Sequence, residues 1–401
     1  MRRRKDGVFS LGLKAFVRKN KAVYKAALLA RKAANPLLRM MMCAFHALRG
    51  IEKNKIYFSC FHGRMYNESP KYICEALHEI YPQGKFVFRL NKNGMQQDDI
   101  PPYVIRVKQG SLKMLYHMST ARVIVKNTNF KPYMKKFADQ YYVQTWHGDR
   151  GYKRIAMDAH PDQPKRYPDN KYMDLALAGS TFARDISFRR AMRYDGEILL
   201  AGVAKNDILV NPPEGLDQRV RAKLGIKDGE KVLLYAPTFR EKTNGSRQSA
   251  NFSLKKLREA LEAAHGCKWR ILVRGHMLNT GVSGDEGMDV SFYPDVSELL
   301  LISDMLITDY SSIAYDYVLL NRPAIHFHAD REEYVEESRK FLFDPEELPF
   351  IIAHSEEELL KIAVNPPDAE ENCREICKFY GIYESGNAAM QAAEYIRRQL
   401  P

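Results

Sequence analysis

The feature that most constrains the fold is a regular alternation, from residue 55 onward, of short apolar segments with longer amphipathic ones. The short segments are rich in Val, Ile, Phe and Tyr, as buried strands are, and the longer ones have helical spacing. Such alternation predicts parallel sheets covered by helices on both faces. The predicted strands are residues 55–61, 85–90, 104–107, 122–126, 141–146, 173–178 and 198–202, then 231–236, 269–273, 289–292, 305–308 and 324–327. Helices are predicted at 70–80, 181–193, 254–264, 313–320 and 388–399.

Residues 211–214, which include Pro212 and Pro213, interrupt this alternation near the middle of the chain. A length of 401 residues also suits two domains of ordinary size. We therefore predict an α/β protein with two Rossmann-like domains facing a cleft, residues 51–210 and 211–401, the second including the terminal helix. The chain contains no Gly-x-Gly-x-x-Gly and no P-loop pattern, which argues against a dinucleotide enzyme and a P-loop NTPase.

Positive charge is concentrated in the first fifty residues. Thirteen of the 62 Lys and Arg residues lie there with one acid, Asp6, so the remainder holds 49 basic and 48 acidic residues. A nearly neutral body argues against nucleic acid as a partner, which would need a basic face on the fold itself. The six cysteines are scattered without a CxxC pair, so we expect reduced structural thiols and no metal site.

Residues 1–50 have the pattern of amphipathic helices. If residues 10–34 are helical, one face is apolar (Leu13, Phe16, Val17, Tyr24, Ala27, Leu28) and the other basic (Lys14, Arg18, Lys21, Lys25, Lys32). Pro36 is expected to break this helix, and a second apolar run follows at 37–45. The pattern favours helices lying on an anionic membrane surface. The alternative is a helix packed on the body with a charged outer face.

No apolar stretch is long enough to span a bilayer. The N-terminus is basic but lacks the apolar core and small-residue cleavage site of a signal peptide. We therefore expect a peripheral protein whose body lies at the cytoplasmic face of the plasma membrane.

Four predicted strands run into polar loops, and ligands of open α/β sheets bind beyond the carboxyl ends of strands. The first loop holds His147, Gly148, Asp149, Arg150 and Gly151. The glycines permit a sharp turn. A histidine titrates near neutral pH, so His147 can take a proton from an acceptor hydroxyl. Taken alone, a histidine hydrogen-bonded within its own loop is the plainer interpretation.

The second and third loops carry groups suited to phosphate. Thr238 and Arg240 follow one predicted strand, and Arg274, Gly275 and His276 follow the next. Arg presents a planar, permanently charged fork to phosphate oxygens, and Gly lets an anion approach the backbone. The alternatives are an ordinary turn with a surface Arg for the second loop and a merely charged loop for the third.

The fourth loop, with Asp309, Ser311 and Ser312, lies between a predicted strand and a predicted helix. A helix start attracts anions through its free N–H groups and dipole, and the serines add hydroxyl donors. Capping of the helix by Asp309 or Ser311 is the alternative, and it is compatible with phosphate binding. Together, the four loops describe a histidine in one domain facing a phosphate site in the other, as transfer from a nucleotide diphosphate donor requires.

An ordered set of motifs, over roughly residues 55–350, resembles the CDP-glycerol glycerophosphotransferase family. The motifs are Trp146–His147–Gly148, Ala178–Gly179–Ser180, Tyr235–Ala236–Pro237–Thr238–Phe239–Arg240, Arg274–Gly275–His276, Thr308–Asp309–Tyr310–Ser311–Ser312 and Phe341–Leu342–Phe343–Asp344. The string from Ser303 to Ser312 is the most specific part.

The resemblance implies a GT-B-like fold and transfer of glycerol phosphate from CDP-glycerol to a lipid-linked saccharide or polyol-phosphate acceptor, with release of CMP, in teichoic acid synthesis. It implies His147 as the base and His276 as a second functional histidine. It places Thr238, Arg240, Arg274, Gly275, Ser311 and Ser312 at the donor phosphates, with Gly148, Asp149, Arg150 and Asp309 as further candidates. It implies no tightly bound cofactor or metal.

Two stretches depart from the family pattern. Residues 147–153 read His-Gly-Asp-Arg-Gly-Tyr-Lys where the family commonly reads His-Gly-Thr-Pro-x-Lys, and residues 202–207 read Gly-Val-Ala-Lys-Asn-Asp where it often reads Gly-x-Pro-Arg-x-Asp. Both departures concern the acceptor and the polyol more than the fold. The alternatives are therefore transfer of ribitol or another polyol phosphate, a GT-B nucleotide-sugar glycosyltransferase, or a membrane-bound scaffold with a degenerate site.

Overall fold

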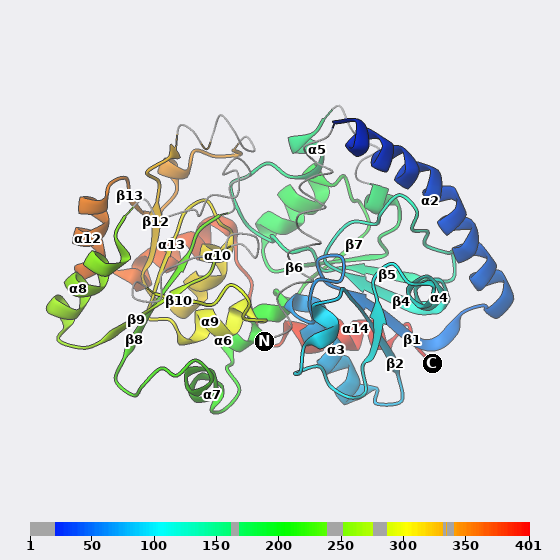
Figure 1. Ribbon diagram of the computed structural model, residues 1–401, viewed down its shortest axis with the longest axis horizontal. Helices are drawn as coiled ribbons and strands as arrows, with labels where there is room; N and C mark the ends of the chain where they lie inside the picture. Colours follow the sequence, from blue (N-terminus) through cyan, green and yellow to red (C-terminus); the bar gives the residue numbers. More distant parts are fainter. Residues whose placement is uncertain (1–20, 162–167, 239–251, 276–286, 332–333, 335–340) are drawn as a thin grey trace.

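The computed structural model describes residues 21–161, 168–238, 252–275, 287–331, 334 and 341–401. Two parallel sheets lie side by side, the first on the right of Figure 1 and the second on the left. The α/β architecture with two Rossmann-like units, predicted from the strand–helix alternation, is confirmed. His276 and Arg240 lie outside the described residues, as do Leu13, Lys14, Phe16, Val17 and Arg18 and the side chains of Lys21, Tyr24, Lys25, Ala27, Leu28 and Lys32.

The first sheet has the strand order β3-β2-β1-β4-β5-β6-β7. Its strands are β1 (Glu52–Ser59), β2 (Lys85–Leu90), β3 (Ile105–Lys108), β4 (Ala121–Lys126), β5 (Tyr141–Gln144), β6 (Leu175–Ala178) and β7 (Glu197–Leu200). Its helices are α2 (Lys21–Arg49), α3 (Glu68–Ile80), α4 (Leu112–Thr120), the short α5 (Ala156–Ala159) and the π-helix η4 (Ala183–Ala191). The strand order reverses between β1 and β4, which makes the carboxyl ends of these strands the expected ligand crevice.

The second sheet has the order β10-β9-β8-β11-β12-β13 and its own reversal between β8 and β11. Its strands are β8 (Lys231–Ala236), β9 (Trp269–Val273), β10 (Met288–Asp289), β11 (Met305–Thr308), β12 (Ala324–Phe327) and β13 (Ile351–Ala353), which was not predicted. The helices are α6 (Asp207–Val210), α7 (Leu216–Lys223), α8 (Leu254–His265), α9 (Val296–Ile302), α10 (Ile313–Tyr317), α12 (Glu356–Val364), α13 (Ala369–Tyr380) and α14 (Ala388–Arg397).

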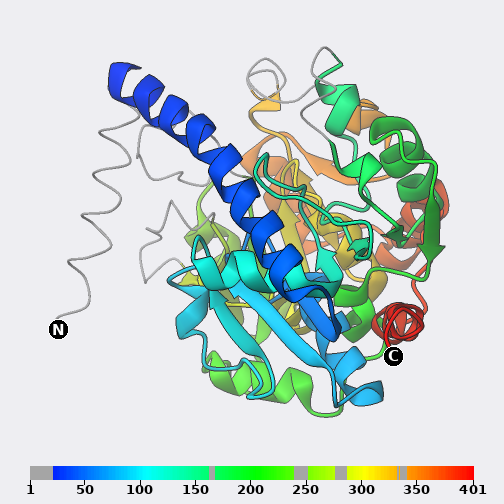
Figure 2. The same cartoon turned by 90° about the vertical axis from the view of Figure 1, so that its right-hand side faces the viewer.

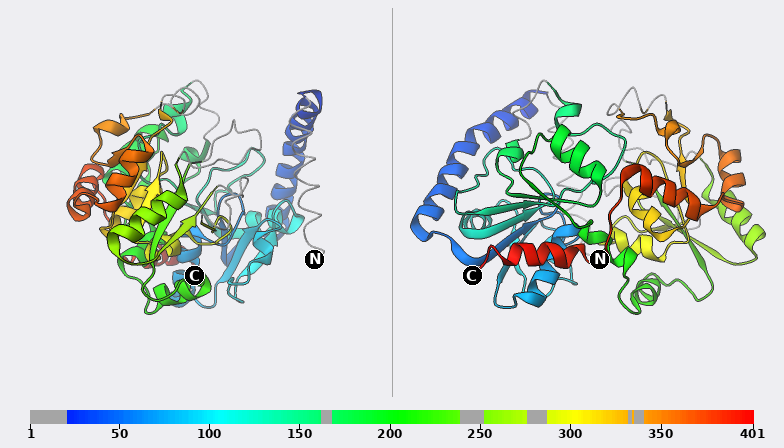
Figure 3. Two further views of the ribbon diagram at one scale, coloured as in Figure 1. Left: turned by 60° about the vertical axis from the view of Figure 1, so that its left-hand side comes forward. Right: turned by 180° about the vertical axis from the view of Figure 1, so that it is seen from behind.

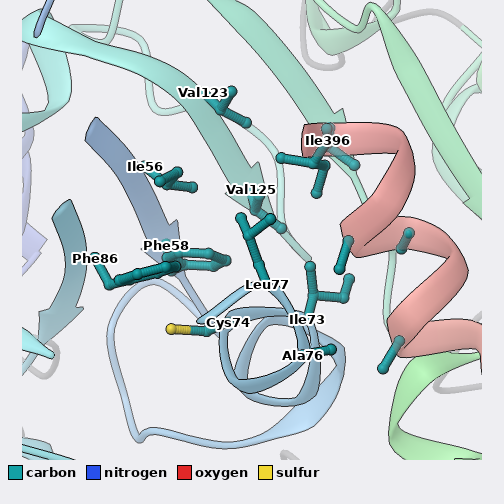
Figure 4. Close-up of a cluster of buried hydrophobic side chains, with 14 of the residues drawn as sticks. Ile56, Phe58, Ile73, Cys74, Ala76, Leu77, Phe86, Val123, Val125 and Ile396 are labelled. Atoms are coloured by element: carbon teal, nitrogen blue, oxygen red, sulfur yellow. The ribbon is translucent and has the colours of Figure 1, made fainter. Parts of the chain in front are cut away.

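Helix α14 packs on the first sheet, although the sequence prediction grouped it with the second domain (Figure 3). Its small and apolar residues, among them Ala392 and Ile396, pack against Ile73 and Leu77 of α3 (Figure 4). An apolar stripe shows that a helix needs a partner but not which one, so its position depends on where the returning chain meets a matching surface. The chain therefore passes between the two units twice, once before the second sheet begins and once after it ends.

Pro36 lies inside α2, so the prediction that it breaks this helix is wrong. A proline in a helix interior removes one hydrogen bond and crowds the preceding turn. Packing of the following turns offsets this cost, since Met42 is buried, and Leu38, Met41 and Phe45 pack against the core of the first sheet. The N-terminal end of α2 stands away from the body (Figures 2 and 3). Within the described ranges, no helix is both long and apolar enough to cross a bilayer.

Candidate active site

His147 lies in the loop after β5 and is held by a backbone hydrogen bond. Its Nδ1 is 2.6 Å from the carbonyl oxygen of Asn127, the residue that follows β4. A carbonyl oxygen only accepts, so Nδ1 carries the hydrogen and Nε2 of the neutral ring keeps its lone pair. The ring also makes an edge contact with Phe61, with centroids 5.2 Å apart. The backbone therefore presents a preoriented proton acceptor.

Two pockets meet at His147, and both are lined by residues from the two sheets. The larger has a volume of about 190 Å³ and is lined by the loop that carries His147, by the π-helix η4 and by residues at the start of α10. Ser312 and Tyr315 line both pockets from the second unit, and Gly148 and Arg150 line both from the first. Four candidates from the sequence thus converge at one place: His147, Gly148, Arg150 and Ser312.

Asp149 and Arg150 form hydrogen bonds and ion pairs with neighbouring protein groups at the site. The Asp149 carboxylate accepts from the Gly179 N–H and the Ser180 hydroxyl, each at 2.9 Å, and from Arg150 Nε at 2.9 Å. The buried Arg150 guanidinium also bonds to Glu384 and, at 3.3 Å, to the Tyr315 carbonyl oxygen.

The Arg150–Glu384 pair lies deep in the protein. Burial opposes the charge of Arg150, but Glu384, Asp149 and Asp316 outweigh it and raise the pKa of the guanidinium. Burial raises the pKa of Glu384 to about 7, although Arg150 acts in the opposite direction. We therefore treat Arg150 as permanently charged and as the centre that connects the two units.

A second charged network, which the sequence prediction missed, lines the smaller pocket. Lys205 Nζ lies 2.9 Å from Asp316 Oδ2 and 3.5 Å from Glu68 Oε2, and Asn206 bonds the other Asp316 oxygen at 2.9 Å. Despite burial, Lys205 and Arg150 hold the pKa of Asp316 below its usual range, whereas burial raises that of Glu68. The departure from the family pattern at residues 202–207 was the available signal, since it contains Lys205.

In the second unit, Asp309 organises the loop after β8. Its Oδ1 accepts from the Thr238 N–H at 2.7 Å and from the Thr238 hydroxyl. The hydrogen bond joins the ends of β8 and β11 at the point where the strand order reverses. Thr238, predicted as a phosphate donor, thus directs both of its donors to Asp309 in this structure.

Arg274 follows β9 and braces the neighbouring loop. Its Nη1 donates to the carbonyl oxygens of Val290 and Tyr293, at 3.2 and 3.0 Å. Burial lowers the pKa of Arg274, while Asp295 and Glu68 act in the opposite direction. Gly275 follows it and is half-buried. Neither residue lines the two pockets at His147.

Ser311 and Ser312 precede α10. Ser312 is exposed and faces both pockets, whereas the Ser311 hydroxyl lies 3.4 Å from the Ile313 N–H. Across the described ranges, no three His, Cys, Asp or Glu side chains form a cluster that could hold a metal ion.

Comparison with known proteins identifies close relatives of the whole fold. Residues 40–398 match the family described as CDP-Glycerol:Poly(glycerophosphate) glycerophosphotransferase. The chain is 33% identical over 374 residues to the teichoic acid poly(glycerol phosphate) polymerase of Staphylococcus epidermidis, covering 87% of this chain and 51% of that protein. It is 32% identical over 332 residues to the teichoic acid glycerol-phosphate transferase of Staphylococcus aureus, covering 77% and 82%.

A solved structure of a variant of the wall teichoic acid polymerase TagF, soaked with CDPG, superposes with a TM-score of 0.76 at 28% identity. The match covers 94% of this chain and 98% of that one. The chain spans about half the length of the Staphylococcus epidermidis polymerase.

Proposed function

Because this chain belongs to the CDP-glycerol:poly(glycerophosphate) glycerophosphotransferase family, we propose that it transfers glycerol phosphate from CDP-glycerol to an acceptor hydroxyl and releases CMP. The acceptor is a lipid-linked saccharide or polyol phosphate in the synthesis of wall teichoic acid or a related polymer. The observation that carries the proposal is the position of His147, whose Nδ1 is fixed by Asn127 while its ring lines two pockets shared by both sheets.

The reaction is attack of the acceptor oxygen on the donor phosphorus that bears the glycerol. As the new P–O bond forms, His147 Nε2 takes the hydroxyl proton. The bond between that phosphorus and the bridging oxygen breaks, and its electron pair leaves with CMP. A well-placed base contributes about 10²–10⁴-fold, and stabilisation of the charge on the leaving phosphate is often the larger contribution.

The second unit is proposed to hold the donor. Ser312 is the donor-site candidate that lines both pockets together with His147. Arg274, Gly275 and Ser311 lie at neighbouring strand ends of the same sheet. Arg240 and His276, which continue these loops in the sequence, complete the proposed donor set. Asp309 contributes indirectly by holding the Thr238 loop in place.

Helix α2 is proposed to hold the enzyme at the cytoplasmic face of the membrane. Leu29, Leu37, Met40 and Leu48 are 66%, 55%, 61% and 80% exposed. At 100° per residue they fall within about 100° of one another around the helix. An exposed apolar face beside a basic segment fits the interface of an anionic bilayer, where a lipid-linked acceptor is concentrated.

The test is release of CMP from CDP-glycerol by the purified chain with a lipid-linked saccharide acceptor in detergent. CDP-ribitol and a nucleotide sugar serve as parallel donors. Acceptor-dependent CMP from CDP-glycerol is the expected result, and the length of the product then distinguishes addition of one unit from polymerisation. Turnover of another donor alone would replace the proposed substrate. Absence of turnover with every donor, in a protein that binds none of them by calorimetry, would overturn the enzymatic proposal.

A further inference from the structure

Buried polar groups without hydrogen-bond partners gather at the carboxyl ends of β1, β2 and β4. Arg89 and Lys126 are both 0% exposed. Among the described residues, no group accepts from Nε, Nη1 or Nη2 of Arg89 or from Nζ of Lys126, and the Ser59 hydroxyl is also unpartnered. The Tyr57 hydroxyl lies beside Arg89 without meeting hydrogen-bond geometry, and it is neutral.

The sheet register places these groups side by side. Ser59 pairs with Arg89 on β2 and with Lys126 on β4, so the three residues form one row across adjacent strands. Residues in register on neighbouring strands project from the same face of a sheet. This row ends β1 and β4 at the reversal of the strand order, which is where parallel α/β sheets bind ligands.

Two buried cations without a hydrogen-bond acceptor are costly, and proteins rarely keep them without a function. Lys126 Nζ lies 4.0 Å from the centroid of the Phe130 ring, and such a contact supplies no hydrogen-bond acceptor. Burial lowers the pKa of Lys126, although Asp169 acts in the opposite direction. Asp169 does not accept from Lys126, and its oxygens accept instead from the Phe130 N–H and the Tyr142 hydroxyl. Arg has five donors and no acceptor, so the row needs acceptors from outside these side chains, and an anion would supply them and also balance the positive charge.

The row is connected directly to the proposed base. Asn127 follows Lys126, and its carbonyl oxygen accepts from His147 Nδ1. The Asn127 side chain accepts from the Phe61 N–H at 2.8 Å, and Phe61 contacts the His147 ring. An anion bound in the row therefore lies one residue from the group that orients the base.

The loop after β1 covers the row. A side-chain atom on Gly63 would lie 3.0 Å from both Cγ and the carbonyl oxygen of Arg89, so the loop packs tightly on this residue. Phe61, His62 and Gly63 have φ of 40°, 58° and 91°, a region that Phe and His rarely adopt. Since Arg89 and Lys126 are inaccessible to solvent in this structure, binding requires this strained loop to shift.

We propose that Arg89, Lys126 and Ser59 bind a phosphate group of the acceptor, adjacent to the hydroxyl that His147 deprotonates. The negative charge of the ligand is inferred from the buried row alone. Its identity as the acceptor rests on the proposed function. The donor is assigned to the second sheet, whereas this row belongs to the first, so the phosphate is that of the acceptor. An acceptor that already carries polyol phosphate is thereby favoured over an uncharged saccharide.

The first test measures thermal stabilisation by sn-glycerol 3-phosphate and by inorganic phosphate, against sodium chloride of equal ionic strength. Wild type is expected to gain roughly 2 °C or more. Arg89→Leu and Lys126→Met are expected to lose this gain. Without added phosphate, their melting temperatures are expected to equal or exceed that of wild type, because each removes a buried charge that has no hydrogen-bond acceptor. The matched control is Lys85→Met, at the opposite end of β2, where the lysine has Glu52 as a partner at 2.8 Å.

Lys85→Met is expected to keep the gain. A gain that survives in Arg89→Leu and Lys126→Met, or ligand-free melting temperatures well below wild type in both, would assign the row a structural role and overturn the proposal.

The second test is kinetic. With a phosphate-bearing acceptor, Arg89→Leu is expected to raise the acceptor KM roughly 10- to 100-fold while the donor KM stays within about twofold. A rise in the donor KM instead would assign the phosphate to the donor. If no donor is turned over but the phosphate-dependent stabilisation persists and is lost in the variants, the proposed function fails and the anion site stands. If turnover is normal and the variants change neither measurement, the anion site is wrong and the proposed function stands.

Discussion

The Nδ1 of His147 lies 2.6 Å from the backbone carbonyl oxygen of Asn127, two residues that come from the ends of neighbouring strands β5 and β4. Because a carbonyl cannot donate, this contact fixes both the orientation and the tautomer of the ring. Proton transfer by this ring would therefore use Nε2.

The first prediction concerns this proton transfer. His147→Asn keeps a side-chain N–H that can bond to Asn127 but has no titratable group. We expect kcat to fall about 10²–10⁴-fold with little change in melting temperature or donor affinity. The exposed His265, which bonds to the Val364 carbonyl oxygen on the far side of the second unit, gives a matched control as His265→Asn. A folded His147→Asn protein with kcat near wild type would remove His147 as the base.

The second prediction concerns the buried pair that joins the two units. Arg150→Met leaves Glu384 without its cation in an environment where both side chains are at most 3% exposed. We expect unfolding free energy to fall by about 3–5 kcal/mol, with part recovered in Arg150→Met/Glu384→Gln. Arg184, which pairs with Asp185 at the surface, is the control, and Arg184→Met should cost at most about 1 kcal/mol. Denaturation by urea measures all three, and equal costs at the two arginines would contradict the prediction.

The third prediction concerns pH. Burial lowers the pKa of His62 from 6.5 to about 3, helped by the neighbouring charges of Lys126, Lys131 and Arg89. The folded pKa lies below the unfolded one, so neutral His62 contributes stability that is complete above about pH 6.5. That contribution is lost progressively as the pH falls towards 3.

The measurement is the melting temperature of wild type and His62→Gln at pH 7.5 and pH 5. Wild type should lose more stability on acidification than His62→Gln, since all other titrating groups are shared. Parallel pH dependence in the two proteins would show that His62 is not protonated on unfolding in this range.

The fourth prediction concerns the contact between α3 and α14, two helices far apart in the sequence. Ile73 on α3 is fully buried against α14 (Figure 4). Ile80, at the C-terminal end of the same helix, is 37% exposed. Ile73→Ala is expected to reduce unfolding free energy by about 2–5 kcal/mol, because it leaves a cavity between α3 and α14. Ile80→Ala should cost clearly less. Similar costs in chemical denaturation would mean that the α3–α14 contact is not a fixed part of the core.

The fifth prediction concerns α2. Replacing Leu37, Met40 and Leu48 by Ser removes exposed apolar groups without touching the buried face that holds Met42. We expect binding to anionic vesicles, measured by co-sedimentation, to weaken at least about tenfold. The control replaces Phe292 and Phe379, which are 60% and 49% exposed in the second unit, by Ser. Unchanged binding of the triple variant, or equal loss in the control, would assign the membrane contact to another surface.

The sequence determined the strands most closely where they are buried on both faces. Strands β2, β8, β9, β11 and β12 begin and end where predicted, because a strand covered on both sides is a continuous apolar run between turns. The three-residue β13 is too short to give such a signal. The π-helix η4 was predicted only as a helix, since side-chain spacing does not distinguish one bulged turn pattern from another.

The sequence also located His147, Arg150 and Ser312 at strand ends, because parallel sheets present these ends at one edge. Only the tertiary structure decided what each residue does there. Arg150 reaches Glu384, 234 residues further along the chain, and Lys205 reaches Glu68 and Asp316 on different units. From the sequence alone, Arg89 and Lys126 are ordinary charged residues near strand ends. Only the sheet register places both beside Ser59. Local periodicity records whether a side chain is buried, whereas its partner depends on how distant segments pack, and no local pattern carries that information.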